Sequence, residues 1–292
     1  MYGKILLVGT VSNVAKTIDK ELKIVFKALS IFDSVDIFLV ESDSNDATTI
    51  SLNNTKFSNL NFQFMSFGTL RGKYPNRIER IAFCRNVYVK YIQANYKKNK
   101  WDYIAVADLD GMNLNLSKKA IKSCFEFNTK WDGMMANQKF GYYDIYALRA
   151  KEWVEEDCFL AMSHARKIKP KPKLFTFSFL NFIIQFIHFD KLRQTYIYDK
   201  MKILKLNSDL IRVQSAFGGF AIYRPYVFVG QYYKTSDLVE SEHVYFHRTG
   251  NNRNRNFYIN PRLINNYMNT YNINRLTIIR FLRELKKYLN LV

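Results

Sequence analysis

Two aspartates, Asp108 and Asp110, stand where an apolar segment of the sequence ends. Residues 103–113 read YIAVADLDGMN, so the apolar run precedes the pair and Gly111 follows it. Side chains two positions apart on a strand point to the same side, so both carboxylates can face one bound object. Neighbouring carboxylates repel each other unless a cation lies between them, and such oxygen ligands suit Mg²⁺ or Mn²⁺ that is shared with phosphate oxygens. The pair predicts a metal that holds a diphosphate; the alternative is two ordinary turn residues.

Polar residues also follow other apolar runs that we predict to be strands. Thr10, Ser12 and Asn13 follow the first run, and the segment ESDSNDAT (41–48) follows the second. In an open α/β sheet, ligands bind at the carboxyl ends of the strands, close to a switch in strand order. We therefore expect these clusters and the aspartate pair to meet at one edge of a sheet.

The elements that must position these residues alternate along the first 110 residues. Apolar runs predict strands at 4–8, 34–42, 62–67 and 103–107, and helical spacing predicts helices at 17–28 and 76–96. This alternation is typical of an α/β fold with a mostly parallel central sheet and flanking helices. The second half is less regular, with strands predicted at 131–137 and 216–223.

Six segments carry a resemblance to a known family. They are ESDSNDAT, RIERIAFCRN, ADLDG, YYDIYALR, SAFGGFAIYR and SEHVYFH, and they occur in family order over about residues 4–250. The sequence resembles the GT-A glycosyltransferases, more closely the bacterial and fungal type related to capsule mannosyltransferases. The resemblance implies a GT-A-like, Rossmann-type sheet and sugar transfer from a nucleotide-sugar donor to an acceptor hydroxyl, usually with Mn²⁺ or Mg²⁺ at the aspartate pair.

The resemblance also implies roles for residues on the donor side. Glu41 and Asp43 would lie near the nucleoside of the donor, and Asp108 would contact the ribose or a metal-bound water. Asp110 would bind the metal. One helix would present further polar groups, namely Arg77, Arg80, Arg85 and Asn86. The alternative for the arginines is a solvated basic helix face.

Further residues are assigned to the sugar and the catalytic step by the same resemblance. Asp144 would lie near the donor sugar or the acceptor, unless it only caps a loop. Glu242 falls where related inverting enzymes have a catalytic base, and the sequence leaves open whether this chain inverts or retains. Gly218 and Gly219 would floor the sugar site or form a turn, and His243 or His247 would complete the metal shell or be structural. The family cysteine before the Glu-His pair is Ser241 here.

Composition limits the other classes of function. The chain has a net charge of +19 and is 48% hydrophobic and 16% aromatic, so a full core is expected and polyanionic partners are favoured. Its three cysteines show no metal-binding or CxxC spacing, which suggests a reducing compartment. A nucleic-acid-binding protein is one alternative, but no RNP-like, zinc-finger or helix-turn-helix pattern is present. An inactive transferase fold that serves as a membrane-surface scaffold is another.

Two segments combine basic and apolar residues. The first is an insertion at 165–205 within a predicted catalytic domain of residues 1–255, and its apolar part, Leu174–Phe189, is shorter than the roughly 20 residues that span a bilayer. Lys167, Lys169, Lys171 and Lys173 precede that part. The second is an amphipathic basic helix in a predicted C-terminal extension, 256–292. These segments predict a cytoplasmic enzyme, peripheral on the inner face of an anionic membrane, where a lipid-linked saccharide acceptor would be presented. The alternative is that 174–189 is a core helix or a dimer contact.

Overall fold

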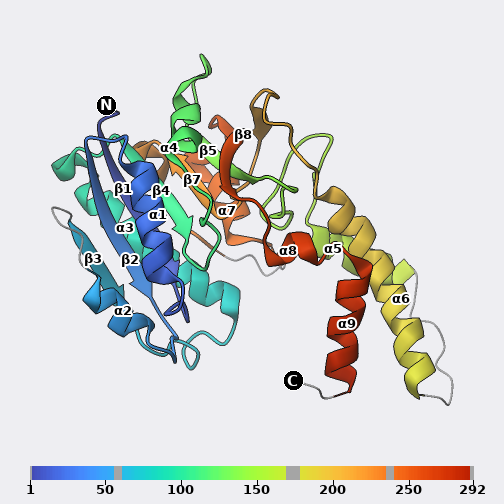
Figure 1. The fold of residues 1–292 in the computed structure, drawn as a ribbon. Coiled ribbons are helices and arrows are strands. Elements are labelled where there is room, and N and C mark those ends of the chain that lie inside the picture. The colour runs from blue at the N-terminus through green and yellow to red at the C-terminus, as the bar shows by residue number, and fades with distance from the viewer. Residues whose placement is uncertain (1, 56–60, 169–177, 235–239, 290–292) are drawn as a thin grey trace.

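The structure is a computed structural model that describes residues 2–55, 61–168, 178–234 and 240–289 of the chain. In this part of the chain, one eight-stranded sheet has the strand order β3-β2-β1-β4-β7-β5-β8-β6, with helices on both faces (Figure 1). The strands are β1 (Lys4–Val11), β2 (Ser34–Glu41), β3 (Phe62–Ser66), β4 (Tyr103–Asp108), β5 (Gly133–Gln138), β6 (Ile211–Val213), β7 (Phe220–Tyr223) and β8 (Phe257–Asn266). The α-helices are α1 (Ile18–Leu29), α2 (Thr48–Asn54), α3 (Arg77–Asn99), α4 (Lys118–Lys122), α5 (Cys158–Ile168), α6 (Ser178–Tyr196), α7 (Glu242–Arg248), α8 (Thr270–Ile273) and α9 (Thr277–Tyr288).

The first four strands are parallel and are covered on both faces. β1 pairs with β2 and β4, and β2 pairs with β3, all in parallel register. Ile5 and Leu7 of β1 belong to the core that α1 covers, whereas Leu6 and Val8 belong to the core that α3 covers. A strand buried on both faces has a continuous apolar sequence, which explains why these strands are visible in the sequence.

The remaining strands are mixed in direction. β7 is antiparallel to both β4 and β5, β8 is parallel to β5, and β6 is antiparallel to β8. The predicted α/β architecture, with a mostly parallel sheet and flanking helices, is confirmed. β8 lies beyond residue 255, so the segment 256–292 contributes a strand to the same sheet.

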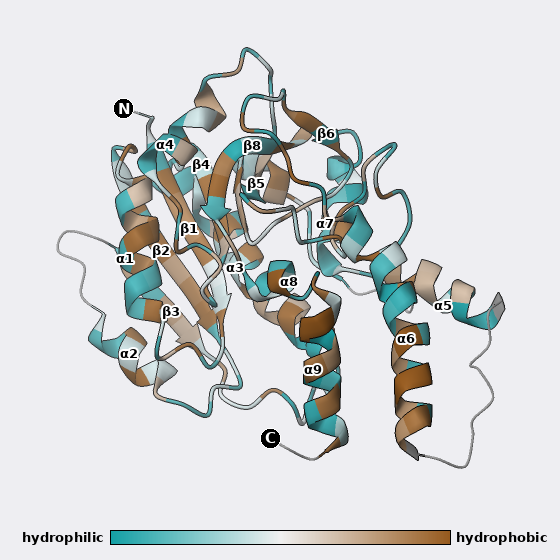
Figure 2. Cartoon of the chain, turned by 45° about the vertical axis from the view of Figure 1, so that its right-hand side comes forward, coloured by the Kyte–Doolittle hydropathy of each residue, from teal (hydrophilic) through white to brown (hydrophobic). Residues whose placement is uncertain are grey.

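Helices α6 and α9 project side by side from one end of the molecule (Figures 1 and 2). The ring of Phe281 on α9 contacts the rings of Phe182 and Phe186 on α6, with centroids 6.0 and 5.1 Å apart. Arg280 of α9 forms a buried ion pair with Asp190 of α6, in which Nη2 lies 2.7 Å from Oδ2. The two helices therefore form one unit, which we call the α6–α9 pair.

Apolar side chains remain exposed on the α6–α9 pair. They are Phe179, Leu180 and Ile187 on α6, and Leu276, Ile278, Leu282, Tyr288 and Leu289 on or beside α9. None of the helices in the described ranges is both long and apolar enough to cross a bilayer. The predicted basic residues Lys169, Lys171 and Lys173, and positions 174–177 of the apolar run, lie outside the described residues.

Candidate functional site

A cavity of about 470 Å³ lies at the carboxyl ends of β1, β2 and β4. Thr10 and Asp108 are register partners on adjacent parallel strands, so the sheet itself places them side by side. α3, α7 and α8 contribute further walls, together with loop residues such as Tyr143, Asp144 and Phe217. The predicted site residues that line this cavity are Thr10, Asp43, Arg77, Arg85, Asp108, Asp110, Asp144, Glu242 and His243.

The loop after β4 buries Leu109 and leaves Asp110 open to the cavity. The N–H of Asp108 donates to the carbonyl of Gly219 at 2.9 Å, which joins the end of β4 to the segment before β7. Limited hydration within the cavity, together with the charge of Asp108, raises the pKa of Asp110 to about 6. Two acids that repel each other at an opening of this kind favour a bound cation.

Arg85 of α3 connects two of the carboxylates. Its side chain is 4% exposed, and it reaches Asp108 Oδ1 at 2.9 Å through Nη2 and Glu242 Oε1 at 3.1 Å through Nε. Burial alone would lower the pKa of this guanidinium, but the nearby Tyr88, Asp108 and Glu242 outweigh it and raise the pKa well above its usual value. Arg85 is therefore a permanent buried cation and not part of a solvated helix face.

Arg77 and Arg80, at the start of α3, differ in their partners. Arg80 Nε lies 3.3 Å from Asp43 Oδ2, and its Nη1 donates to the carbonyls of Tyr74 and Pro75. Arg77 lines the cavity and has no ion-pair or hydrogen-bond partner among the described residues. Its guanidinium thus remains available to an anionic ligand.

Asp43 lines the cavity after β2 and bonds to the loop that follows β3. Its backbone is left-handed, with φ of +59°, as is that of Asn13 with φ of +55°; both line the cavity. Asp43 Oδ1 accepts from the N–H groups of Leu70 and Arg71 at 2.9 and 3.1 Å. Asn and Asp tolerate this conformation better than most residues, and such backbone strain is concentrated at functional sites.

Asp144 lines the cavity, and the two glycines support it and Asp108 through backbone hydrogen bonds without lining the cavity themselves. Asp144 Oδ2 accepts from the N–H of Gly218 at 3.0 Å, and burial raises the pKa of Asp144 to about 6. Gly218 and Gly219 have φ of +73° and +81°, and a Cβ at Gly218 would lie 2.6 Å from the carbonyl oxygen of Ala136. The segment therefore requires glycine at Gly218, for conformation and for space.

His243 is a buried imidazole that faces the cavity without a hydrogen bond. It stacks on Phe217 at 4.1 Å, and neither ring nitrogen has a hydrogen-bond partner among the described residues. Burial, together with the charge of Arg85, holds its pKa well below 6.5, so the ring is neutral. Buried polar atoms are normally paired, and a neutral imidazole is the form that binds metals.

Five predicted site residues do not line the cavity: Gly218 and Gly219, which are described above, and Glu41, Asn86 and His247. Glu41 is buried and accepts from the N–H of Ser44 at 3.0 Å, and it also bonds to Ser66. Asn86 is bonded through its side-chain amide to the backbone N–H and carbonyl of Tyr233. Each of these two therefore fixes a neighbouring segment.

His247 also lies outside the lining. Its Nδ1 lies 3.1 Å from Ser215 Oγ, and its Nε2 lies 2.9 Å from Tyr223 Oη. Both ring nitrogens are thus engaged within the core, so of the two histidines His243 lines the cavity that contains the aspartate pair and His247 does not.

The cavity also contains aromatic residues that the sequence did not single out. Tyr143 and Tyr271 stack beside Asp144, with centroids 4.9 Å apart and planes at 17°. Tyr143 precedes Asp144 in the YYD segment, which was the available signal. Tyr271 comes from α8, beyond the last family-like segment, where no sequence signal marked it.

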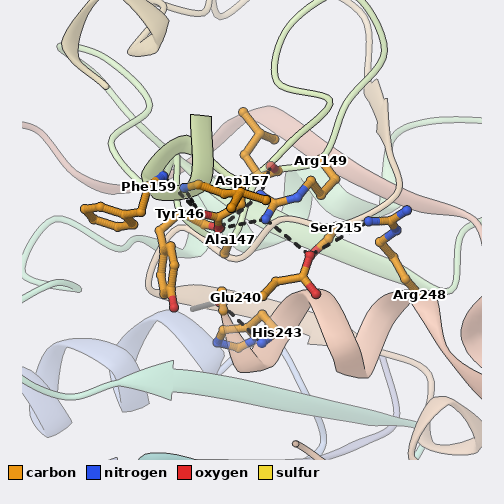
Figure 3. A network of polar contacts seen from close by, with 12 residues as sticks. Tyr146, Ala147, Arg149, Asp157, Phe159, Ser215, Glu240, His243 and Arg248 are labelled. Carbon is orange, nitrogen blue, oxygen red and sulfur yellow. Dashed lines mark hydrogen bonds and ion pairs between the residues drawn. The ribbon is translucent and has the colours of Figure 1, made fainter. Parts of the chain in front are cut away.

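A buried arginine supports the wall that contains Tyr146. Arg149 Nη2 lies 3.0 Å from Asp157 Oδ2 and 3.4 Å from Glu240 Oε1, and Nη1 donates to the Tyr146 carbonyl at 3.1 Å. Figure 3 shows the ring of Tyr146 and the imidazole of His243 on the same side of this network. The network therefore fixes the backbone from which Tyr146 reaches the cavity.

No protein-family model and no curated protein matches the sequence. The chain is similar to the solved structure of residues 1–349 of TarS from S. aureus, with 17% identity, 88% of this chain and 57% of that chain covered, and a TM-score of 0.44. It is also similar to the mannosyltransferase PcManGT from Pyrobaculum calidifontis in complex with GDP-Man and Mn²⁺, with 9% identity, coverage of 98% and 64%, and a TM-score of 0.49.

A third similar structure is glucosyl-3-phosphoglycerate synthase from Mycobacterium tuberculosis with UDP, at 10% identity, coverage of 90% and 69%, and a TM-score of 0.39. The chain spans less than two thirds of the TarS and PcManGT structures, at 57% and 64% of their lengths. Because these TM-scores and identities are low, the proposal that follows rests on the sequence segments and on the geometry of the cavity.

Proposed function

We propose that this protein is a metal-dependent glycosyltransferase that moves a sugar from a nucleotide-sugar donor to a hydroxyl of a saccharide or lipid-linked saccharide acceptor. The observation that carries the proposal is that Asp108 and Asp110 line one cavity together with Arg77, which has no hydrogen-bond or ion-pair partner among the described residues. That cavity lies at the carboxyl ends of parallel strands, where open α/β sheets bind ligands. The carboxylates suit a divalent cation, and the neighbouring guanidinium of Arg77 suits the diphosphate that would share that cation.

The donor set suits Mn²⁺ or Mg²⁺ bound together with a diphosphate. Among the residues that the structure describes, no three His, Cys, Asp or Glu side chains gather into a metal site of their own. Such ions are often held by one or two carboxylates and take their other ligands from phosphate and water. Asp110 would hold the ion, with Asp108 beside it, and phosphate and water would supply the other ligands. His243, which lines the same cavity, would become a ligand only if its ring and the two aspartates came closer together when the donor binds. When bound, the ion would neutralise charge that develops on the leaving diphosphate.

The remaining lining residues divide between the two ends of the cavity. Thr10 and Asp43 stand at the strand ends that would receive the nucleoside. Arg77 would donate to the diphosphate. Asp144 would lie against the transferred sugar, because it lines the cavity together with Asp108, and the N–H of Gly218 would hold its carboxylate in place.

Glu242 is the residue that we assign as general base, with Asp144 as the second carboxylate of the reaction. One oxygen of Glu242 is fixed by Arg85 at 3.1 Å, which orients the carboxylate in the cavity. Burial raises the pKa of Glu242 even though Arg85 opposes the change. A raised pKa brings a carboxylate closer to the range in which it accepts a proton efficiently.

We also propose that the enzyme works in the cytoplasm, on the inner face of an anionic membrane. The α6–α9 pair supports this placement, because it combines exposed apolar side chains with the basic residues Arg283, Lys286 and Lys287. α8, which contributes Tyr271 to the cavity, directly precedes α9. A lipid-linked acceptor at the membrane would thus be presented close to the cavity.

Hydrolysis of a panel of UDP- and GDP-sugars tests the transferase directly. We expect the wild-type protein to hydrolyse at least one donor slowly with Mn²⁺ and to lose this activity in EDTA. Asp110→Ala should lower the rate by about a hundredfold or more, because the metal would lack its main protein ligand. Asp209→Ala removes an exposed acid outside the cavity and serves as the matched control. Hydrolysis that persists in EDTA, or none with any donor, would overturn the proposal.

A further inference from the structure

Glu21 is a buried carboxylate that does not line the cavity. It lies on α1 within the buried stripe formed by Ile18, Leu22 and Val25, and it is 0% exposed. Placing a carboxylate in an apolar stripe is costly unless hydrogen-bond donors compensate for the lost water. The position of those donors therefore shows what this residue does.

Among the described residues, the hydrogen-bond donors to Glu21 all come from the loop that follows Asp110. Glu21 Oε2 accepts from the N–H of Gly111 at 2.7 Å. Its Oε1 accepts from the N–H and the side-chain amide of Asn113, at 2.8 and 3.0 Å. The carboxylate of Glu21 thus binds the backbone immediately after Asp110, the residue that would bind the metal.

Buried amides of β8 hold the same loop from the other side. Asn266 donates to the carbonyl of Gly111 at 3.1 Å, and Asn265 donates to Asn113 Oδ1 at 3.1 Å. Asn113 in turn donates to the carbonyl of Asp108 at 2.6 Å. The loop that contains Asp110 is therefore clamped between α1 and β8.

The chain of hydrogen bonds continues to the floor of the cavity. Asn265 and Gln138 both donate to the carbonyl of Gly218, at 2.9 and 2.8 Å. The N–H of Gly218 donates to Asp144. Asn113, Asn265 and Gln138 are all fully buried, so no water competes for these bonds.

We infer that Glu21 is a positioning residue for metal binding: it fixes the loop that presents Asp110, and the buried amides keep that loop in register with Asp144. This inference rests on the proposed metal-dependent transfer. In Glu21→Gln the shape is kept, but an NH₂ group would face one of the loop N–H groups. At least one bond would be lost, and Asp110 would be released from its position.

Measuring Mn²⁺ binding tests this inference. Binding is monitored by the decrease in the EPR signal of free Mn²⁺, once in the presence of UDP and once in the presence of GDP. Burial raises the pKa of Glu21 to about 7, so the titration is made above that pH. Glu21→Gln should weaken Mn²⁺ binding about tenfold or more, as supporting residues of metal sites do. Asn266→Ala, which removes a single contact to the loop, should weaken it less. In donor hydrolysis, Glu21→Gln should raise the Mn²⁺ concentration needed for half-maximal rate.

Asn260→Ala is the matched control, because Asn260 is a fully buried amide on β8 that bonds to Ser123 and does not contact the loop. It should lower the melting temperature without changing Mn²⁺ binding. If the wild type binds Mn²⁺ and both Glu21→Gln and Asn266→Ala bind it equally well, the inference is wrong and the proposed function stands. If the wild type binds none with either nucleotide, both are wrong. Should Glu21→Gln fail to fold, Asn266→Ala decides.

Discussion

Arg85 gives the two carboxylates that it joins a fixed geometry. Because the guanidinium is buried and forms ion pairs with both Asp108 and Glu242, turning either acid away would remove part of the charge that compensates a buried cation, which is destabilising. The pairing also leaves each carboxylate with a second oxygen for a ligand. At the scale of residues the site consists of charged side chains in fixed positions, and each of them can be neutralised separately by a single substitution.

Glu242→Gln tests the role of the base. The amide keeps the shape of the side chain but cannot accept a proton, so turnover should fall by about a hundredfold or more. Binding of UDP or GDP with Mn²⁺ should survive, since Asp108 and Asp110 are unchanged. Glu240→Gln, two residues earlier and paired with Arg149, is the control. Turnover equal to that of the wild type would return Glu242 to a structural role.

At the scale of elements, the sequence was most informative where strands are buried on both faces. β1, β2 and β4 have continuous apolar runs for this reason, and the polar residues after them mark the ligand edge of the sheet. β8 could not be placed in the same way, because its buried Asn260, Asn265 and Asn266 interrupt any apolar pattern. Those amides bond to loops far away in the sequence.

The sequence could not separate the two histidines of α7 either. His243 and His247 are four residues apart and so lie near the same helix face. Only the fold shows that Ser215 and Tyr223 occupy the nitrogens of His247. Glu21 did leave a signal, since a glutamate three residues after Ile18 and four before Val25 stands in the apolar stripe of its helix.

Membrane docking is a prediction about the α6–α9 pair. Sedimentation with phosphatidylcholine vesicles, with and without phosphatidylglycerol, should show binding only to the anionic vesicles and weakening as salt rises. Ile278→Asp with Leu282→Asp should abolish binding, since both side chains are exposed and apolar. Lys286→Glu with Lys287→Glu should weaken it.

The controls use a basic site elsewhere on the molecule. Lys97→Glu with Lys98→Glu changes two exposed lysines at the end of α3 by the same total charge. That variant should bind the vesicles nearly as well as the wild type. Equal binding to neutral vesicles, or none at low salt, would remove the support for a membrane location.

The whole molecule has a net charge of +19, but its cavity gathers acids next to a few arginines. A positive surface brings anionic ligands toward the protein from any direction. The cavity then selects among them, since carboxylates repel a bare polyanion and accept one that arrives with a divalent cation. Charge on the whole molecule and chemistry in the cavity are both compatible with the proposed metal–nucleotide ligand.

Calorimetric titration of the wild-type protein with UDP and with GDP, in Mn²⁺ and again in EDTA, tests this central claim most directly. A site formed by Asp108, Asp110 and Arg77 should bind at least one of the two nucleotides in Mn²⁺. Without the ion, the diphosphate would face the negative charge of the aspartates. The affinity for the nucleotide should therefore be at least about tenfold weaker in EDTA than in Mn²⁺. Equal affinity in both buffers, or no binding of either nucleotide in Mn²⁺, would contradict a metal-dependent nucleotide-sugar site.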